Sequence, residues 1–332
     1  MKLLPVLLIA AGIAVMAALV LHFGAGAVAD SLLAVGLGGF VSVTLIHTAL
    51  IAVMGLAWQA LLPGTRPWVA VWGRFVRDAG SEVLPLSQVG GYVLGTRAVA
   101  LAGVPATLGA ATTIVDVTLE FVGQIAYTAL GLIWLLHLHA QGVAPQFVVL
   151  GLAGSSCLAG GFIVAQRRGM GYVDRIARVL GQGWAERTAA GAAALHHALE
   201  ATYRRRNGIW LCFLIHFLCW IVSASEIWVA LRFAGEPLPF GAAIVIESMV
   251  YAIRSVAFVV PNSVGVQEGA YLLLGGAFGL SPEMALALSL LKRARDLVIG
   301  LPTIALWQAI EGGRLARRVA AKPAPEPVAG RD

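Results

Sequence analysis

Charged side chains inside long apolar segments are the residues of this sequence best placed to do chemistry. Asp116 and Glu120 lie four residues apart, so they share one face of a helix. Glu247 and Arg254 lie seven apart and share a face as well. A third group lies in the last long apolar segment: Lys292, Arg293, Arg295 and Asp296. Because charges in an apolar environment are costly, we expect these residues either to line a polar pathway or to form ion pairs that fix helix packing.

Recognised catalytic and metal-binding patterns do not occur in the sequence. It has no HExxH, no phosphate-binding P-loop, no GxSxG and no DxD-like motif. Two histidine pairs lack a nearby third ligand: His137 with His139, and His196 with His197. The three cysteines lie in apolar runs without the paired spacing of a metal site. We therefore expect no catalytic residue, no metal and no cofactor.

The composition indicates a membrane protein. Of the 332 residues, 59% are hydrophobic and 12% are charged, whereas soluble domains carry about 25% charged residues. Too little polar surface remains to cover a folded globule in water, which excludes an ordinary cytosolic enzyme, a disordered chain and a disulfide scaffold. The net charge is +6, but the basic residues lie in short segments between apolar runs. This distribution argues against a nucleic-acid partner.

The apolar runs predict an all-α polytopic membrane protein with about six full spans. An apolar run of about 20 residues can cross the hydrocarbon core as a helix. Six runs qualify: Leu3–Leu21, Leu32–Leu62, Val104–Leu138, Gln146–Ala165, Ile209–Leu231 and Pro282–Ile310. Two further stretches, Trp68–Gly103 and Phe240–Leu280, are apolar but contain a proline and a glycine cluster near the middle. We expect each to be a re-entrant helical hairpin, or else a pair of full spans.

The two broken stretches are similar, which predicts an internal repeat. Residues 83–87 (VLPLS) match residues 259–263 (VVPNS). The predicted hairpin turns contain Pro85, Gly90 and Gly91 in the first copy, and Pro261, Gly265 and Gly269 in the second. The first copy starts on the cytoplasmic side and the second on the external side, which is an inverted-topology repeat typical of transporters. The alternative is a chance alignment, since proline and glycine are common in membrane helices.

The repeat also relates the buried charges to one another. Asp116 lies eleven residues after Pro105, and Arg293 lies eleven residues after Pro282. We therefore expect Asp116 and Arg293 to face each other across the repeat axis. Non-helical backbone at membrane depth is tolerated only where it lines a polar cavity, so residues 85–92 and 261–269 are expected to line one. Glu226 lies toward the external end of its helix and is expected at the interface.

Basic residues predict the orientation, because Lys and Arg gather on the cytoplasmic side of membrane proteins. The basic segments are Arg66–Arg77, Gln166–Asn207 and the chain after Ile310. The connections His22–Ser31 and His137–Pro145 carry no Lys or Arg. Both termini are then cytoplasmic. Residues 1–145 and 146–315 form the two repeats, residues 166–207 a cytoplasmic loop, and residues 316–332 a disordered cytoplasmic tail.

The long basic loop contains a predicted amphipathic helix. Apolar side chains recur with helical spacing through residues 171–203, and arginines occupy the other faces. We expect this helix to lie on the inner leaflet, or else to pack on the helix bundle. The basic flanks attract anionic lipid in either case.

The same motifs resemble the lysylphosphatidylglycerol synthase/flippase transmembrane family. Residues 260–270 (VPNSVGVQEGA), 279–283 (GLSPE) and 292–296 (KRARD) are similar to its C-terminal signature. Residues 84–91 (LPLSQVGG) and 115–120 (VDVTLE) resemble its hopanoid-biosynthesis-associated, HpnL-like branch. The resemblance covers about residues 1–315. This chain has Pro261-Asn262-Ser263 where the family usually has Pro-Gly-Gly, which puts the geometry of the second turn in question.

The resemblance implies a lipid transporter or flippase that moves a polar, hopanoid-related lipid between leaflets. The aminoacyl-transferase domain of two-domain relatives is not in this sequence, so the expected activity is that of the membrane half. The headgroup contacts are then expected from Arg97, Arg254, Glu268 and Arg293, with charge balance or proton transfer at Asp116, Glu120, Glu247 and Asp296. The alternatives are a membrane enzyme or accessory subunit of hopanoid biosynthesis, or a scaffold on which lipid-biosynthesis enzymes dock through residues 166–207.

Overall fold

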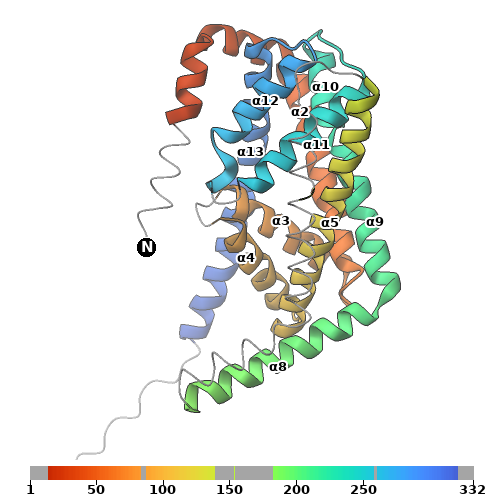
Figure 1. Ribbon diagram of the computed structural model, residues 1–332. Helices are drawn as coiled ribbons and strands as arrows, with labels where there is room; N and C mark the ends of the chain where they lie inside the picture. The colour runs from red at the N-terminus through yellow and green to blue at the C-terminus, as the bar shows by residue number, and fades with distance from the viewer. Residues whose placement is uncertain (1–13, 84–86, 139–152, 154–181, 258–259, 321–332) are drawn as a thin grey trace, which may run out of the picture.

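The computed structural model describes residues 14–83, 87–138, 153, 182–257 and 260–320 (Figure 1). Within these residues the chain forms helices and no strand, which confirms the predicted all-α class for this part of the chain. The helices are α2 (Ala25–Gln59), α3 (Pro67–Val83), α4 (Ser87–Leu101), α5 (Ala106–Leu138), α8 (Gln182–Arg204), α9 (Arg206–Ser223), α10 (Ser225–Phe233), α11 (Phe240–Val256), the short 3-10 turn η1 (Pro261–Ser263), α12 (Val266–Ala277) and α13 (Pro282–Ala320).

Three helical segments in the described part of the chain are long and apolar enough to cross a membrane: Ala25–Gln59, Ala106–Leu135 and Arg206–Phe233. They correspond to the predicted runs Leu32–Leu62, Val104–Leu138 and Ile209–Leu231, with shifted ends. The last of them consists of α9 and α10, which meet at Ala224. Much of Leu3–Leu21 and nearly all of Gln146–Ala165 lie outside the described residues.

The predicted run Pro282–Ile310 lies within α13, which continues to Ala320. The prediction of a disordered tail from residue 316 is therefore wrong for residues 316–320, which are helical. Basic residues at the end of a helix suit its negative dipole end, so the arginines there are compatible with continued helix. Residues 321–332 lie outside the described part of the chain.

Each broken stretch contains two short helices. α3 and α4 occupy the lower half of the molecule, and α11 and α12 occupy the upper half (Figure 1). α4 has 15 residues and α12 has 12, which correspond to lengths of about 23 Å and 18 Å. Both lengths are below the roughly 30 Å of the hydrocarbon core.

Glycines allow α3 and α4 to approach closely. A Cβ atom added at Gly91 would lie 2.0 Å from Ser81 Oγ and 2.4 Å from the backbone oxygen of Arg77. One at Gly95 would lie 3.0 Å from the backbone oxygen of Gly73. The backbones of the two helices are therefore in direct contact, and the α3–α4 hairpin is a tightly packed unit.

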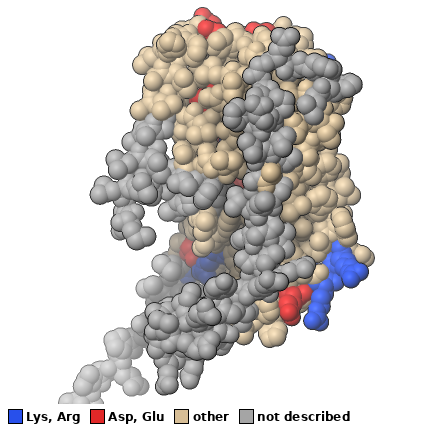
Figure 2. All heavy atoms as spheres, in the orientation of Figure 1, with Lys and Arg blue, Asp and Glu red and all other residues tan. Residues whose placement is uncertain are grey.

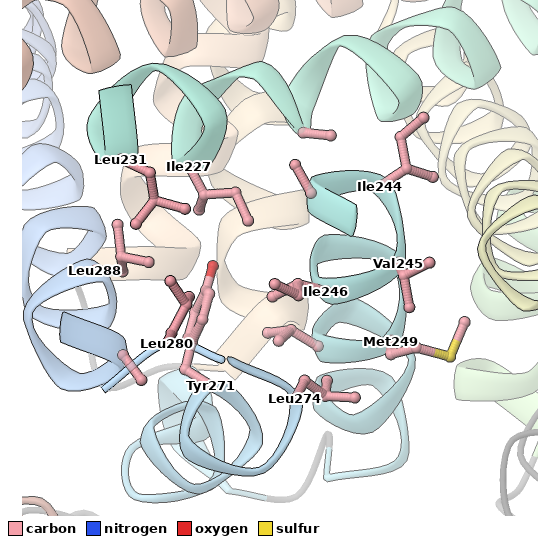
Figure 3. Close-up of a cluster of buried hydrophobic side chains, with 14 of the residues drawn as sticks. Ile227, Leu231, Ile244, Val245, Ile246, Met249, Tyr271, Leu274, Leu280 and Leu288 are labelled. Atoms are coloured by element: carbon pink, nitrogen blue, oxygen red, sulfur yellow. The ribbon is translucent and has the colours of Figure 1, made fainter. Parts of the chain in front are cut away.

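A large apolar core lies in the upper half of the molecule, where α10, α11, α12 and α13 meet. Figure 3 shows Ile227 and Leu231 of α10 above Tyr271 of α12, with Ile246 of α11 and Leu288 of α13 on either side. All five side chains are buried. This cluster holds the α11–α12 hairpin against α13 by burial of apolar surface.

The outer surface is apolar along the flanks of the molecule. Leu33 and Leu37 of α2 are 74% and 77% exposed, and Trp210 and Leu214 of α9 are exposed as well. Figure 2 shows mainly uncharged side chains on the visible flank, with most visible Lys and Arg toward the lower end. Large exposed apolar flanks are unfavourable in water and are expected for a surface that faces lipid.

α8 lies across the lower end of the molecule (Figure 1). Leu195, Leu199 and Tyr203 pack against an apolar cluster formed by α5 and α9. Of the two alternatives for the predicted amphipathic helix, packing on the helix bundle holds for this part of α8. Residues 171–181, at the start of the predicted helix, lie outside the described residues.

Candidate functional site

A buried ionic cluster, here named the α3–α5 cluster, lies in the lower half of the molecule. Its members are Arg74, Arg77, Asp78, Asp116, Glu120 and His216. Arg74 and Arg77 lie three residues apart on α3 and face Asp116 and Glu120, four apart on α5. Arg77 Nη1 donates to Asp116 Oδ2 at 2.6 Å, and Arg77 Nη2 donates to Glu120. Arg74 Nη2 donates to Glu120 Oε1 at 2.7 Å, and its Nε donates to Asp78 at 2.8 Å.

α9 closes the α3–α5 cluster. His216 Nε2 lies 2.9 Å from Asp116 Oδ1, and Cys212 Sγ lies 3.4 Å from the same oxygen. The side chains of Asp116 and His216 are fully buried. His216 Nδ1 is also buried, and it has no hydrogen-bond partner among the described residues. The cluster therefore contains one imidazole nitrogen whose hydrogen-bonding capacity is unused.

The same three side chains could be considered as metal ligands. The donor atoms of Asp116, Cys212 and His216 lie within 4.8 Å of one another, and these are ligand types that zinc accepts. However, the second oxygen of Asp116 is bonded to Arg77, and Arg74 Nη1 lies 3.8 Å from it. Two guanidinium groups beside the carboxylate repel a cation, so we assign a hydrogen-bonded cluster rather than a metal centre.

A second buried ionic cluster, here named the α10–α13 cluster, lies in the upper half. Its members are His47, Glu226, Glu247, Lys292, Arg295 and Asp296. Lys292 Nζ lies 2.5 Å from Glu247 Oε2 and 3.4 Å from Glu226 Oε2. Arg295 donates to Glu226 through Nη1 and to Asp296 through Nη2, the latter at 2.7 Å. These contacts tie α13 to α10 and α11.

Two further side chains complete the α10–α13 cluster. His47 of α2 places Nδ1 at 2.8 Å from Glu226 Oε1 and Nε2 at 3.8 Å from Asp296 Oδ1. Tyr271 of α12 donates its hydroxyl hydrogen bond to Glu247. Every carboxylate of this cluster is therefore paired, as buried charges require.

A third polar group lies at the start of α12. Glu268 is fully buried, and its Oε2 accepts a hydrogen bond from the backbone N–H of Gly265 at 2.7 Å. Its Oε1 accepts from Arg293 Nε at 2.6 Å and from Ser289 at 3.0 Å. Gly265 has a φ of 83°, a left-handed conformation that favours glycine. The turn before α12 is therefore bonded to α13 through one carboxylate.

The turn itself keeps the conformation that glycines would favour. Asn262 and Ser263 have φ values of 51° and 47°, although the family resemblance has glycine at both positions. Asparagine tolerates this region better than most residues because its short side chain bonds nearby backbone. Asn262 Nδ2 donates to the backbone oxygen of Glu82 at 2.9 Å. The replacement of Gly-Gly by Asn262-Ser263 therefore leaves a left-handed turn and adds a bond to α3.

The ends of the two hairpins meet at what we name the tip junction, formed by Glu82, Arg254, Asn262, Glu268 and Arg293. Besides the Asn262 bond, Arg254 Nη2 lies 3.5 Å from Glu82 Oε1. Arg293 Nη1 and Nη2 reach the backbone oxygens of Asn262 and Ser263 at 3.3 Å and 3.4 Å. The side chains of Arg254 and Arg293 are each 14% exposed, and that of Glu82 is 23% exposed. Three charged groups of the tip junction, Glu82, Arg254 and Arg293, are thus partly accessible, whereas Glu268 is as buried as Asp116 and Glu247.

The structure separates the predicted site residues into three places. Asp116 and Glu120 belong to the α3–α5 cluster, and Glu247 and Asp296 belong to the α10–α13 cluster. The tip junction contains the other three interior residues: Arg254, Glu268 and Arg293. Pro85 of the first predicted turn lies outside the described residues.

The prediction that Asp116 pairs with Arg293 is wrong. Asp116 finds its cation on α3, at Arg77, and Arg293 finds its carboxylate on α12, at Glu268. The physical reason is that each half supplies its own counter-charge on the helix before or after its break. A buried charge pairs with the nearest partner that packing offers.

Arg97 lies apart from the other predicted site residues: its side chain is 46% exposed and bonds to Glu311 at 2.7 Å. One further prediction is corrected. Glu226 is not interfacial, because it is buried within the α10–α13 cluster. The short helix α10 turns this side chain inward toward α13, which a count of residues from the helix end does not indicate.

Several members of both clusters are not among the predicted site residues. Arg74 and Arg77 lie in a basic segment of the sequence that predicts a cytoplasmic connection, whereas both are buried in α3. A signal was available, because the spacing Arg-x-x-Arg-Asp at residues 74–78 recurs as Lys-x-x-Arg-Asp at residues 292–296. No sequence pattern singled out His47 and His216, since each lies alone in an apolar helix.

Comparison with known proteins identifies the family of the sequence. The family described as "Lysylphosphatidylglycerol synthase TM region" matches residues 4–302. No curated protein and no solved structure matches the chain. The family and the three long apolar helices together make this a membrane protein with a lipid-related function. The chain belongs to the lysylphosphatidylglycerol synthase transmembrane-region family.

Proposed function

We propose that this protein moves a polar lipid between the two leaflets of the membrane, with the headgroup passing the tip junction and the tails remaining in lipid. The family match supports a lipid substrate, because it covers 4–302 of the 332 residues and concerns the membrane region of lipid-modifying proteins. The proposal goes beyond the family description in naming an activity and a site.

The tip junction is the observation that carries this proposal. It joins the hairpin of the lower half to the hairpin of the upper half through Glu82, Arg254 and Asn262. Broken helices and partly accessible charges within the membrane are tolerated where they line a polar passage. Arg254 and Arg293 offer guanidinium groups that suit a lipid phosphate or another anionic headgroup, because the planar fork binds such oxygens in pairs.

The proposed arrangement in the membrane follows the sequence analysis. The two hairpins are re-entrant and belong to an inverted repeat, with about six full spans around them. In this arrangement the lower end of Figure 1, where α8 and the start of α9 lie, is the cytoplasmic side of a bacterial inner membrane. Exposed arginines belong to these helices, to α4, to α13 and to the loop before α3: Arg66, Arg97, Arg204, Arg205, Arg206 and Arg314. Both termini then lie on that side, and anionic lipids gather at this basic end.

The lipid class that we favour is a polar lipid of hopanoid type. The support is the resemblance of residues 84–91 and 115–120 to the hopanoid-associated branch. A test therefore includes such a lipid beside an ordinary anionic phospholipid.

The experiment is a leaflet-resolved assay with the purified protein in liposomes. A fluorescently labelled phosphatidylglycerol and a labelled hopanoid with a polar side chain are followed by the rate at which a membrane-impermeant quencher reaches them. The wild-type protein is expected to accelerate leaflet exchange over empty liposomes. Arg254→Gln and Arg293→Gln are each expected to slow it about tenfold, because a hydrogen bond to a charged group contributes about 1.5–3 kcal/mol.

The control variant is Arg232→Gln, because Arg232 is exposed at the end of α10 and stacks on Trp228 rather than on the tip junction. Its exchange rate is expected to equal that of the wild type. Exchange at the empty-liposome rate for every lipid would refute lipid movement. If cells lacking the protein instead showed altered lipid amounts with normal sidedness, a membrane enzyme or accessory subunit of lipid assembly would replace it.

A further inference from the structure

The two ionic clusters have the same composition. The α3–α5 cluster contains two cations, Arg74 and Arg77, with three carboxylates and one histidine. The α10–α13 cluster contains two cations, Lys292 and Arg295, with three carboxylates and one histidine. In each cluster the cations and one carboxylate follow the spacing basic-x-x-Arg-Asp on a single helix. The similarity therefore extends to the arrangement along the chain.

Each cluster lacks one positive charge when its histidine is neutral. Three carboxylates then face two cations in a buried environment, where an uncompensated charge is far more costly than at a surface. Histidine is the side chain whose ordinary titration falls between about pH 5 and 8. A single proton bound in each cluster restores neutrality.

The histidines are positioned to accept that proton. In the α3–α5 cluster, His216 is bonded to Asp116 of α5, and Cys212 of its own helix contacts the same carboxylate. Around Asp116 and Glu120 lie Arg74 and Arg77 of α3, which balance these two carboxylates, and Asp78 adds the third negative charge of the cluster. His216 Nε2 is bonded to Asp116 at 2.9 Å, which leaves Nδ1 as the buried, unpartnered acceptor. The open position on the imidazole is the place where a proton can be added.

His47 has the corresponding position in the α10–α13 cluster. It is bonded to Glu226 of α10 and lies 3.8 Å from Asp296 of α13. Lys292 and Arg295 of α13 contact the same Glu226. Its side chain is 23% exposed. It lines a crevice between α2, α3 and α13 together with Asp78, Glu82 and Asp296. Asp78 is a member of the other cluster, so this crevice connects the two clusters and opens His47 to exchange.

Each histidine lies in one predicted repeat of the chain and bonds to a carboxylate of the other repeat. His216 lies in the second half and bonds to Asp116 of the first, whereas His47 lies in the first half and bonds to Glu226 of the second. A change of charge on either histidine therefore acts on the contact between the halves. Movement of one half relative to the other is how transporters with inverted repeats alternate their access.

We infer that the two clusters are a pair of proton-binding sites, one in each half, and that protons bound through His47 and His216 drive the lipid movement. Proton binding is inferred from the two clusters alone, whereas the coupling of protons to lipid movement rests on the proposed function. One proton is taken up from one side of the membrane, neutralises a cluster, and is released to the other side when the halves rearrange. No other reactant is consumed.

The proton-binding part is tested by double-variant cycles of thermal stability in detergent, which need no transport. His216→Gln leaves the α3–α5 cluster with an excess negative charge and is expected to lower the melting temperature. Adding Asp78→Asn removes one carboxylate and is expected to restore part of the loss. His47→Gln with Asp296→Asn is the matching cycle in the other cluster. A double variant no more stable than its histidine single would refute proton binding, because it would show that the histidine only packs.

The coupling part is tested in liposomes that contain labelled phosphatidylglycerol and carry a pH gradient. In the wild type the gradient is expected to shift the steady-state distribution of the lipid between leaflets about tenfold per pH unit for each coupled proton. His47→Gln and His216→Gln are expected to abolish this shift. His196→Gln removes a histidine of α8 that lies outside both clusters and is expected to keep it.

The outcomes separate the two proposals. Leaflet exchange that ignores the gradient would refute the coupling and leave the proposed function standing. Restored stability in both cycles without any leaflet exchange would refute the proposed function and support the proton sites.

Discussion

Arg77 shows how buried charges are arranged at the scale of single residues. It lies in α3 with 2% of its surface exposed and is bonded to Asp116 and Glu120 of α5. In the upper half, Lys292 is likewise a buried cation bonded to a carboxylate: it is 3% exposed and is paired with Glu247. In the lower half the first helix of the hairpin, α3, carries the cation and α5 carries the carboxylate. In the upper half the first helix of the hairpin, α11, carries the carboxylate and α13 carries the cation. The two halves therefore pair equivalent helices, with the positive and negative charges exchanged.

The first residue-scale prediction concerns the loss of Arg77. Arg77→Gln leaves Asp116 with one fewer charge-assisted hydrogen bond and the cluster with a larger negative excess. Breaking a buried ion pair in this way costs about 3–5 kcal/mol. We expect a large fall in the melting temperature in detergent, with partial recovery when Asp116→Asn is added.

The control for this prediction is a different second change. Arg293→Gln removes a cation that belongs to the tip junction, so its effect is expected to add to that of Arg77→Gln without recovery. Recovery by Arg293→Gln and none by Asp116→Asn would contradict the pairing described here.

The sequence predicts that Asp116 and Glu247 are buried, but it does not predict their partners, and it places the buried Glu226 at the interface. Asp116 and Glu247 stand out because each interrupts an apolar run. Their partners depend on which helices pack together, and Arg77 looks like a loop residue because Arg66 and Arg74 lie close to it in the sequence. The histidines carry no local pattern, so only the fold shows that they complete the clusters.

The α3–α4 hairpin shows how small residues determine the shape of an element. Gly91 and Gly95 of α4 lie against the backbone of α3, where a Cβ atom has no space. The backbones then approach as closely as two helices can, and this contact positions Arg74 and Arg77 toward α5. The positions of the charges therefore depend on glycines several residues away.

The element-scale prediction compares two glycines. Gly91→Ala introduces a Cβ atom 2.4 Å from a backbone oxygen of α3, so the hairpin must spread, at a cost of about 1–3 kcal/mol as for other overpacked sites. Gly269→Ala meets no atom within 4 Å and lies in α12, so it is expected to stabilise the protein by about 0.4–1 kcal/mol. Melting temperatures of the two variants, measured side by side, test the difference in sign. Equal effects would show that the α3–α4 contact is looser than the structure indicates.

Helices were easier to predict than their ends. The apolar runs identify α2, α5 and the α9–α10 segment because length and composition are sufficient. The division of that last segment at Ala224 and the extension of α13 to Ala320 leave no mark in hydropathy. The break at Ala224 depends on packing, because α10 turns so that Glu226 reaches α13. The last turns of α13 have no apolar periodicity from which a helix could be predicted.

The described residues differ in charge between the two ends of the molecule. α8 and the end of α13, at the lower end of Figure 1, carry the exposed Arg204 and Arg314, whereas the exposed charged residues at and after the end of α10, near the upper end, are Arg232 and Glu236. Such a distribution orients membrane proteins with the basic end in the cytoplasm.

The division of the chain into two repeats, residues 1–145 and 146–315, stays a prediction.

The whole-molecule prediction concerns orientation. With the native cysteines replaced, Arg66→Cys and Glu236→Cys are expected to react with a membrane-impermeant thiol reagent from opposite sides of the membrane. Arg66→Cys should be labelled only in inside-out vesicles, and Glu236→Cys only in intact cells or right-side-out vesicles. Labelling of both positions from one side would contradict the orientation, because it would require an even number of membrane crossings between residues 66 and 236.

The exchange of histidines between the halves has a consequence for biogenesis. Helices leave the ribosome in chain order, so α3 and α5 reach the membrane before α9 has been synthesised. During that interval Asp116 has no imidazole beside it, and Glu226 in turn finds His47 of the already inserted α2. The α3–α5 cluster is therefore completed only after α9 has been synthesised, whereas Glu226 meets a histidine that is already in the membrane.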